Sequence, residues 1–508
     1  MKDKTTSEKI FSVFLKALFA LPLLLGVYGL AVLEGEPLLD SLFASVTMYF
    51  VNYGDVPPNI FVEIARWTAL IADLGILVSA VIFLREKAGN LFKSCIIRKS
   101  VAVYGAETEK KTLLRQLKWY RRIDGGNGFV RAQQYILLNN ETANFDFYNK
   151  YRNKPEEKKS GKKSRMFYIK ADPMWTRFVD RPDVKLFSPE ESAARLFWKS
   201  DELWGCREKC PYALIAGKAE PELDIVLIGF GKLGEELIYW GLQNNIFFAD
   251  QRIRYHVFGD CAGFISTHTE LEHISDKIFQ HTEPWTDRVE FIEKADLVLV
   301  PEQREQDALL KDLLFVTVRK DIYVFAPDAS LFAELKKTEG FDRRFVIFPW
   351  QEESYKWENI EKDLLFRNAR AVNELYNRQV KDLHPEYVKE WEELDAFTKY
   401  SNVSTADYDE IWRRILGYRD IPIPENKDGI SAALRDEMAE LEHIRWCRYH
   451  RLNNWKTMER TEGGPNKDKE NRAHVDLVDY RQLSEASRDK DREIAKDRIA
   501  RLRLTGKM

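Results

Sequence analysis

The chain has 508 residues, of which 44% are apolar and 31% are charged, and its 81 acidic and 78 basic side chains give a formal charge of −3. A single hydrophobic core stops growing near ~250–300 residues, so this length predicts several domains. The near-neutral charge lacks the basic excess that binding to a nucleic-acid backbone requires, and we expect no nucleic-acid partner. The apolar fraction excludes a wholly disordered chain.

The five cysteines are too few and too scattered for the disulfide framework of a small secreted protein. Cys206 and Cys210 are spaced like two ligands of a metal site, but no second Cys/His pair lies nearby to complete four ligands. We therefore expect free thiols and no metal.

Two long apolar stretches occur in the first ninety residues. They cover 10–33 and 60–84, and the second contains Glu63, Arg66 and Asp73. About 20 apolar residues span a bilayer, and a cleaved signal peptide has a shorter apolar run, so we expect two membrane spans. Lysine and arginine cluster before the first stretch and after the second. The positive-inside rule then predicts a multi-pass protein of the cell (inner) membrane with both termini in the cytoplasm.

The segment between the two stretches, residues 38–59, contains FVNYGD and is too short to cross a bilayer and return as two helices. A re-entrant loop would fit, and the layout resembles the two-span potassium-channel pore family, which carries TVGYGD at this point. The resemblance implies a filter, a hinge glycine and potassium or another monovalent cation in the pore. The residues concerned are Phe50, Val51, Asn52, Tyr53, Gly54, Asp55 and Gly75. Asp73 would either face the water-filled cavity or pair with Arg66 or Lys16.

Residues 98–220 show the alternation of strands and helices that is typical of βαβ units. A β-branched strand, Ser100–Tyr104, leads into a degraded glycine turn, and further strands are expected at 134–139 and 166–170. Glu107 stands where a phosphate-binding turn would have its second glycine, so we assign this unit no nucleotide.

Residues 221–352 contain a sharper nucleotide-binding pattern. The buried strand Asp224–Ile228 runs directly into the G-x-G-x-x-G sequence of Gly229, Gly231 and Gly234 and then into a helix. The first glycine of this pattern permits a tight turn, the second lets a pyrophosphate approach the backbone, and the third lets the helix pack closely. Asp260 follows the next expected strand, where a carboxylate holds a ribose hydroxyl. The alternative is that the glycines serve packing alone and no ligand binds.

Two such units in tandem resemble the RCK family, also called Trk-type NAD-binding domains. The resemblance implies Rossmann-like folds, NAD or another nucleotide as ligand, and four copies arranged as a ring that gates a pore. The sequence near the strands shows no proton relay and no nucleophile constellation, so we expect no enzymatic activity.

Residues 353–508 read as charged helices with a period of 3.6. Ala439–Trp446 has the form A-E-x-x-H-x-x-W, and Asn454-Trp455, Tyr480 and Lys490-Asp491-Arg492 follow it. This order resembles the ryanodine receptor (RyR) domain, in which a glycine stands where this chain has Asn454. Aromatic walls with a few polar groups suit a nucleotide. The expected pocket comprises Glu442, His443, Trp446, Trp455, Tyr480, Asp491 and Arg492. The alternative is that Glu442 and Trp446, on one helix face, only fix helix packing.

Together these patterns predict a multidomain protein. Its expected parts are an all-α membrane pore domain (1–90), two α/β Rossmann-like domains (98–220 and 221–352) and a mostly α-helical RyR domain (353–508). The expected function is a homotetrameric, ligand-gated cation channel subunit in the lipid bilayer that senses a nucleotide. By analogy, it would serve as a membrane effector of bacterial defence. The alternatives are a non-conducting membrane-anchored sensor or scaffold, a regulator of a separate transport pore, and an NAD-dependent membrane enzyme.

Overall fold

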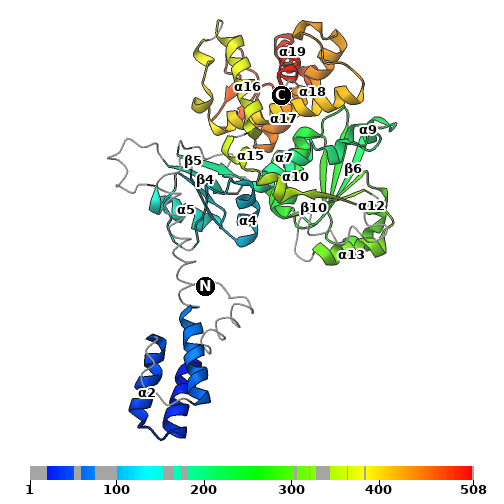
Figure 1. Ribbon diagram of the computed structural model, residues 1–508. Helices are drawn as coiled ribbons and strands as arrows, with labels where there is room; N and C mark the ends of the chain where they lie inside the picture. The colour runs from blue at the N-terminus through cyan, green and yellow to red at the C-terminus, as the bar shows by residue number, and fades with distance from the viewer. Residues whose placement is uncertain are drawn as a thin grey trace. The chain divides into compact units, whose positions relative to one another are not determined.

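The computed structural model divides into two compact units, residues 1–98 and 99–508. Figure 1 shows both units as ribbons. The structure describes residues 20–50, 59–74, 100–126, 128–152, 165–172, 175, 181, 183–301, 306–319, 321–327, 344–362, 364–382 and 385–505.

Unit 1 consists, in its described part, of short helical segments. Helical residues 20–27 continue into the π-helix η1 (Tyr28–Leu33), α2 (Leu38–Thr47) continues into the 3-10 turn η2 (Met48–Phe50), and residues 60–74 are helical. The buried apolar residues of this unit form one small cluster. Its members are Leu30, Met48, Val62, Ala65 and Ala69.

The membrane part of the expected fold class needs correction. Among the described residues, no helix is both long enough and apolar enough to cross a membrane. Within the two expected spans, the structure describes residues 20–33 and 60–74, and these residues are helical. The expected all-α pore domain with two transmembrane helices is therefore wrong, and so is the expected multi-pass, inner-membrane localisation.

The first part of unit 2 is a five-stranded parallel sheet in the order β2-β1-β3-β4-β5. Its strands are β1 (Val101–Tyr104), β2 (Arg122–Asp124), β3 (Gln134–Leu137), β4 (Met166–Lys170) and β5 (Val184–Phe187). Helices α4 (Glu107–Gln116) and α5 (Glu141–Tyr151) connect them. Both faces of the sheet are covered, which explains why all four residues of β1 are apolar and buried. This strand order is that of the flavodoxin-like doubly wound fold.

A short helical connection leads to the second sheet. Ser188 caps α7 (Pro189–Phe197) by accepting a hydrogen bond from the Glu191 N–H at 3.1 Å, and Pro189 is the first helical residue, as their sequence order predicts. The chain then forms α8 (Asp201–Trp204) and α9 (Pro211–Ala216).

The second sheet has six parallel strands in the order β11-β10-β9-β6-β7-β8. The strands are β6 (Glu222–Ile228), β7 (Arg252–Phe258), β8 (Lys277–Gln280), β9 (Leu297–Val300), β10 (Ile322–Ala326) and β11 (Phe345–Pro349). The intervening helical segments are α10 (Gly231–Asn244), α11 (Ala262–Thr267), η4 (Leu271–His273), η5 (Trp285–Arg288), α12 (Val289–Lys294) and α13 (Gln306–Val316). Counted from β6, this is the Rossmann order 3-2-1-4-5-6, and its switch point lies between β6 and β9.

The last part of unit 2 is mainly helical, as expected. Its longer helices are α16 (Leu364–Val380), α17 (Ala396–Tyr418), α18 (Ala432–Leu452) and α19 (Glu485–Thr505). The shorter segments are α14 (Trp350–Ser354), α15 (Trp357–Lys362), η7 (Pro385–Tyr387), η8 (Trp391–Glu393), η9 (Lys427–Gly429) and η10 (Tyr480–Gln482). A small sheet of β12 (Lys456–Thr457), β14 (Ala473–His474) and β13 (Lys467–Asp468) lies between α18 and α19 in the chain.

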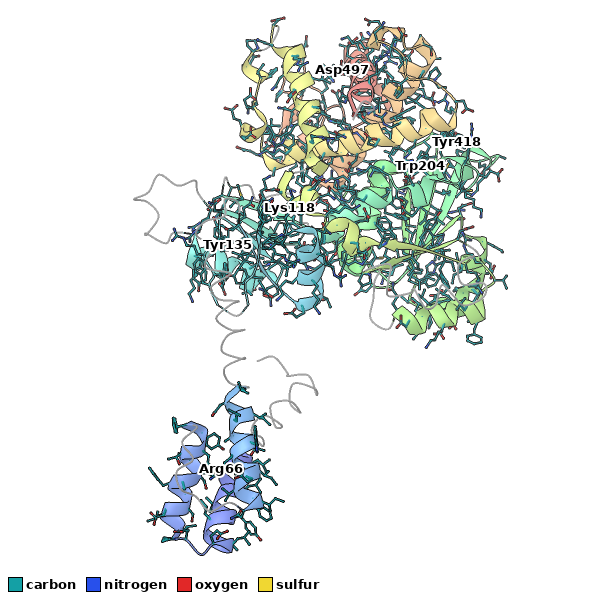
Figure 2. The ribbon with its side chains drawn as sticks, viewed as in Figure 1. Arg66, Lys118, Tyr135, Trp204, Tyr418 and Asp497 are labelled. Carbon is teal, nitrogen blue, oxygen red and sulfur yellow. The ribbon has the colours of Figure 1, made fainter. Side chains whose placement is uncertain are left out.

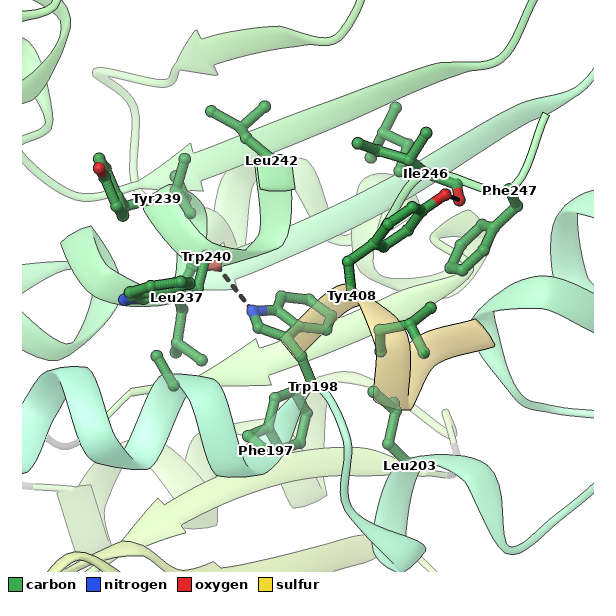
Figure 3. Packing of buried hydrophobic residues seen from close by; sticks show 14 of the residues in the cluster. Phe197, Trp198, Leu203, Leu237, Tyr239, Trp240, Leu242, Ile246, Phe247 and Tyr408 are labelled. Carbon is green, nitrogen blue, oxygen red and sulfur yellow. Dashed lines mark hydrogen bonds between the residues drawn. The ribbon is translucent and has the colours of Figure 1, made fainter. Parts of the chain in front are cut away.

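One continuous core joins the second sheet to these helices. The Trp198 indole donates to the carbonyl of Leu237 in α10 at 2.9 Å, and the Tyr408 hydroxyl of α17 donates to the carbonyl of Ile246 at 2.7 Å (Figure 3). Helix α10 contacts α7, α17 and α18. The first sheet has aromatic packing of its own around Tyr135, which Figure 2 labels. The Tyr135 ring stacks on the Phe167 ring, with 4.9 Å between ring centroids.

Candidate nucleotide-binding site

The three glycines of the G-x-G-x-x-G sequence adopt the roles that their spacing predicts. Gly229 follows β6 with φ of 96°, and its N–H donates to the carbonyl of Phe258 in β7 at 2.9 Å. Gly231 begins α10 with φ of 57°, and a Cβ there would meet no atom within 4 Å. A Cβ on Gly234 would lie 3.1 Å from the Phe230 ring. The loop thus makes a tight turn, leaves open space at its second glycine and packs closely at its third.

The N-terminus of α10 is suited to an anion. The first turn of α10 contains no acidic residue, and its exposed Lys232 adds a positive charge. The first N–H groups of a helix lack partners within the helix, and the helix dipole favours negative charge beside them. Lys232 pairs with Asp172, which follows β4 of the first sheet, at 2.7 Å. A phosphate at this helix end would therefore meet a lysine whose present partner is a carboxylate.

Asp260 lies at the same edge of the sheet as the glycine loop. Ile228 at the end of β6 is in register with Phe258 at the end of β7, and Asp260 follows two residues later. A Cβ added to the intervening Gly259 would approach the carbonyl carbon of Gly229 to 3.1 Å. Asp260 is exposed, and one of its oxygens accepts a hydrogen bond from the N–H of Ala262 at 3.2 Å. The fold thus brings Gly229, Gly231, Gly234 and Asp260 together.

The corresponding edge of the first sheet differs in charge. The first turn of α4 contains Glu107 and Glu109, so its N-terminus already carries negative charge. Buried Lys110 pairs with Glu107 at 2.8 Å and with Asp124, at the end of β2, at 2.9 Å. Two carboxylates and one lysine therefore pair with one another at this end of the sheet. The absence of a nucleotide from this unit stays a prediction.

Glu442, one of the residues expected in the RyR-domain pocket, lies in a buried ion network. Its carboxylate accepts a hydrogen bond from Arg445 of the same helix at 2.7 Å and another from Arg498 of α19. Burial alone would raise the pKa of Glu442, but Arg445 and Arg498 together lower it to about 2. Arg498 also pairs with Asp409 of α17 at 2.7 Å. Glu442 therefore ties three helices together.

His443 lies beside Glu442 but has different partners. Its Nδ1 is 3.3 Å from Asp491, and its Nε2 is 2.8 Å from the carbonyl oxygen of Val478. Burial lowers the pKa of His443, but the hydrogen bonds to Asp491 and Cys447 outweigh burial and raise the pKa to about 11. Both ring nitrogens face oxygen acceptors, which suits a protonated imidazole that donates from each.

The remaining residues of the expected pocket lie in different places. The rings of Trp446 and Tyr480 are each 5.8 Å from the ring of His443. Trp455 is buried and stacks on Phe397, at 5.1 Å between ring centroids. Arg492 pairs with Glu485 and Asp489 of its own helix. His443, Trp446, Tyr480 and Asp491 thus lie together. The His450 ring, 4.1 Å from the Trp446 ring and 5.2 Å from the Trp455 ring, connects Trp455 to them. The ligand-binding role of these residues stays a prediction.

Most of the expected filter residues lie outside the described residues. These are Val51, Asn52, Tyr53, Gly54, Asp55 and the hinge residue Gly75. Phe50 ends η2 with 77% of its side chain exposed, and Asp73 is half-buried within the helical residues 60–74. Arg66, one of the expected partners of Asp73, pairs with Glu63 at 2.5 Å.

Direct contacts between the RyR helices and the nucleotide-binding fold were not predicted. The Asn454 side chain accepts from the N–H of Thr269 and donates to the carbonyl of Thr267, both at 2.9 Å. Thr267 ends α11, the helix that follows Asp260. Asn454 has φ of 60°, a left-handed conformation that asparagine tolerates better than most residues. The sequence signal for this contact was that Asn454 stands where the RyR pattern has a glycine.

Helix α18 also contacts α10 and the loop before β8. Arg448 donates to the carbonyl of Leu242 at 3.0 Å and pairs with buried Asp276 at 2.6 Å. Asn453 donates to the Tyr239 hydroxyl of α10 at 3.2 Å. The helix that begins at the glycine loop is therefore bound directly to the helix that carries Glu442.

Comparisons with known proteins complete the description. No curated protein matches the chain. A solved structure described as a GsuK channel bound to NAD matches 70% of this chain and 83% of that chain, with 11% identity and a TM-score of 0.31. The RyR domain family matches residues 428–507, which include α18 and α19. Residues 428–507 are therefore similar to the RyR domain family, as the sequence pattern in this part of the chain predicts, and the expected bounds 353–508 stay a prediction.

Proposed function

We propose that this protein is a nucleotide sensor in which a dinucleotide such as NAD binds at the loop Gly229–Gly234 and the RyR domain responds to its binding. The observation that carries the proposal is the position of this loop, at the start of α10 and at the switch point of a Rossmann sheet. The N-terminus of α10 has no acidic residue, whereas that of α4 has two. A pyrophosphate would lie at the first of these helices and a ribose beside Asp260.

The contacts of α18 favour sensing as the role of this site. Asn454 holds the end of α11, and Arg448 and Asn453 hold α10. A ligand that orders the glycine loop or the segment after Asp260 would therefore act on elements already bonded to the RyR domain. A ligand shifts such an equilibrium only by the difference in its affinity for the two arrangements.

Calorimetric titration of the full chain with NAD tests the proposal. Gly231→Asp places a carboxylate in the open space where the pyrophosphate would bind, so we expect affinity to fall by about 10-fold or more. Gly463→Asp is the matched control, because Gly463 also has a left-handed φ, of 68°, and no atom within 4 Å of an added Cβ, and it lies outside the glycine loop, between β12 and β13. Equal binding by both variants, or no binding of NAD, NADH or ATP by the unaltered chain, would refute the proposal.

The proposal includes no catalysis, and it includes a homotetramer. An NAD-dependent enzyme would consume the dinucleotide, so chromatography of NAD after incubation with the protein separates the two functions. Native mass spectrometry with and without NAD measures the number of copies. A tetramer that forms only with NAD would link assembly to sensing.

A further inference from the structure

A hollow of about 250 Å³ opens in the C-terminal part of unit 2, where α17 begins and α18 ends. Phe397, in the first turn of α17, and Trp455, just past α18, contribute their stacked rings to its lining. Lys467, Lys469 and Arg472, which lie within six residues of one another in the chain, line it as well. This short segment therefore brings three positive charges to one aromatic wall.

These charges are only partly compensated. The Lys467 ammonium lies 4.9 Å from the centre of the Trp455 ring, and in the described part of the chain no carboxylate pairs with it. Burial, and then the charge of Lys469, lower the pKa of Lys467. Asp395, which also lines the hollow, pairs with Lys469 at 3.4 Å and caps α17 by accepting from the Thr398 N–H at 2.7 Å. Three cations thus face one carboxylate.

The backbone conformation of Arg472 is held in place at the hollow. Its φ of 49° is left-handed, which is uncommon for an arginine and costs free energy. The carbonyl of Arg472 accepts from the N–H of Lys456 at 2.8 Å, and its guanidinium donates to the carbonyl of Asn453 at 3.4 Å. These bonds hold the arginine at the hollow in a conformation that it would not otherwise prefer.

We propose that this hollow binds a small phosphate-bearing ligand of mononucleotide size, with its phosphate among Lys467, Lys469 and Arg472. A phosphate suits three cations better than a single carboxylate does, because it carries more charge and more acceptor oxygens. Phe397 and Trp455, which both line the hollow, would give a base an aromatic wall to contact. The volume lies below the ~300–1,000 Å³ of most ligand sites, which favours a mononucleotide over a dinucleotide.

The hollow is separate from the glycine loop yet connected to it. Asn453, which lines the hollow, donates to Tyr239 of α10, and the next residue holds the end of α11. Binding in the hollow would therefore bear on the segment that joins the RyR domain to the nucleotide-binding fold. The new site does not depend on the proposed binding of NAD, since none of its lining residues belongs to the glycine loop.

Calorimetry of the full chain with AMP, inorganic phosphate and adenosine tests the site. We expect AMP and phosphate to bind and Lys467→Met to weaken AMP about 10- to 100-fold, which is the effect of losing one charged hydrogen bond. Lys469→Gln should weaken AMP in the same direction. Lys456→Met is the matched control, because Lys456 is an exposed lysine of the same small sheet and does not line the hollow.

Two comparisons separate this site from the glycine loop. AMP binding that is lost in Lys467→Met and kept in Gly231→Asp supports the hollow, and the reverse pattern overturns it. Failure of both AMP and phosphate to bind, or equal affinity for AMP in Lys467→Met and Lys456→Met, also overturns it. Binding of adenosine without phosphate would show that the cations are not the recognition element. An NAD titration of Lys467→Met should match that of the unaltered chain.

Discussion

Replacing Glu442 by glutamine tests whether this residue supports helix packing or belongs to a ligand pocket. Glu442 is 2% exposed and bonds to Arg445 and Arg498, and both arginines are fully buried. Glutamine keeps one acceptor oxygen but removes the negative charge that compensates these arginines. Breaking a buried ion pair from one side costs ~3–5 kcal/mol, and Asp409 still pairs with Arg498, so we expect the lower end of this range.

The pKa of Glu442 gives a consistent magnitude. It falls from 4.5 to about 2 on folding, and one unit corresponds to ~1.36 kcal/mol, so the charged form contributes about 3 kcal/mol. Because the folded-state pKa is depressed, this stability is present above pH 4.5 and is lost as the pH falls towards 2. The difference between Glu442→Gln and the unaltered chain should therefore be largest near neutral pH and shrink below pH 4.5.

Hydrogen exchange followed by mass spectrometry is the suitable assay, because a chain with several domains need not unfold in one step. We expect about 100-fold faster exchange of the α18 and α19 amides in Glu442→Gln, which is the loss of about 3 kcal/mol expressed as a rate ratio. Glu440→Gln, on the same helix and half-buried, is the control. Equal exchange in the two variants would refute the packing role.

Three further predictions concern other residues. Asp260→Asn should reduce the preference for NAD over NADP about 10-fold, because the carboxylate that accepts a ribose 2′-hydroxyl is lost. Calorimetry with both dinucleotides measures this preference. An unchanged ratio of the two affinities would show that Asp260 does not belong to the site. Asn454→Gly keeps a left-handed turn possible but removes the side chain that bonds to Thr267 and Thr269. In this variant, NAD should no longer alter hydrogen exchange in α18. If NAD still alters it, the coupling takes another route. The pKa of His443 rises on folding from 6.5 to about 11. The stability that protonated His443 gives to the folded chain is therefore fully present below pH 6.5 and is lost as the pH rises towards 11. Asp491→Asn removes the partner, so its melting temperature should fall less between pH 7 and 10 than that of the unaltered chain, and an equal fall in both would contradict the His443–Asp491 pair.

Local sequence predicted the nucleotide-binding fold well. A buried strand followed by three glycines and a helix depends on neighbouring residues only, and β6, the glycine loop and α10 occur where that pattern predicts. Strand β8 was not predicted, because Lys277–Gln280 is short and mostly exposed and lacks the apolar run that marks a buried strand.

The apolar stretches of unit 1 show the limit of such local reasoning. Apolar length alone predicted two membrane spans, but among the described residues no helix is long and apolar enough to cross a membrane. Hydropathy records which residues avoid water and does not by itself define a helix.

The sequence by itself determined the order of the domains, the glycine loop and the RyR pattern, because each is a contiguous or regularly spaced set of residues. Only the tertiary structure showed which partners the charged residues of the RyR domain have. Glu442 lies beside His443 in the chain, yet its partner Arg498 is 56 residues away, and Asn454 meets Thr267 across 187 residues. Burial and pairing of charges depend on such distant partners. The glutamate that suggested a ligand pocket therefore lies in a buried ion network that joins α17, α18 and α19.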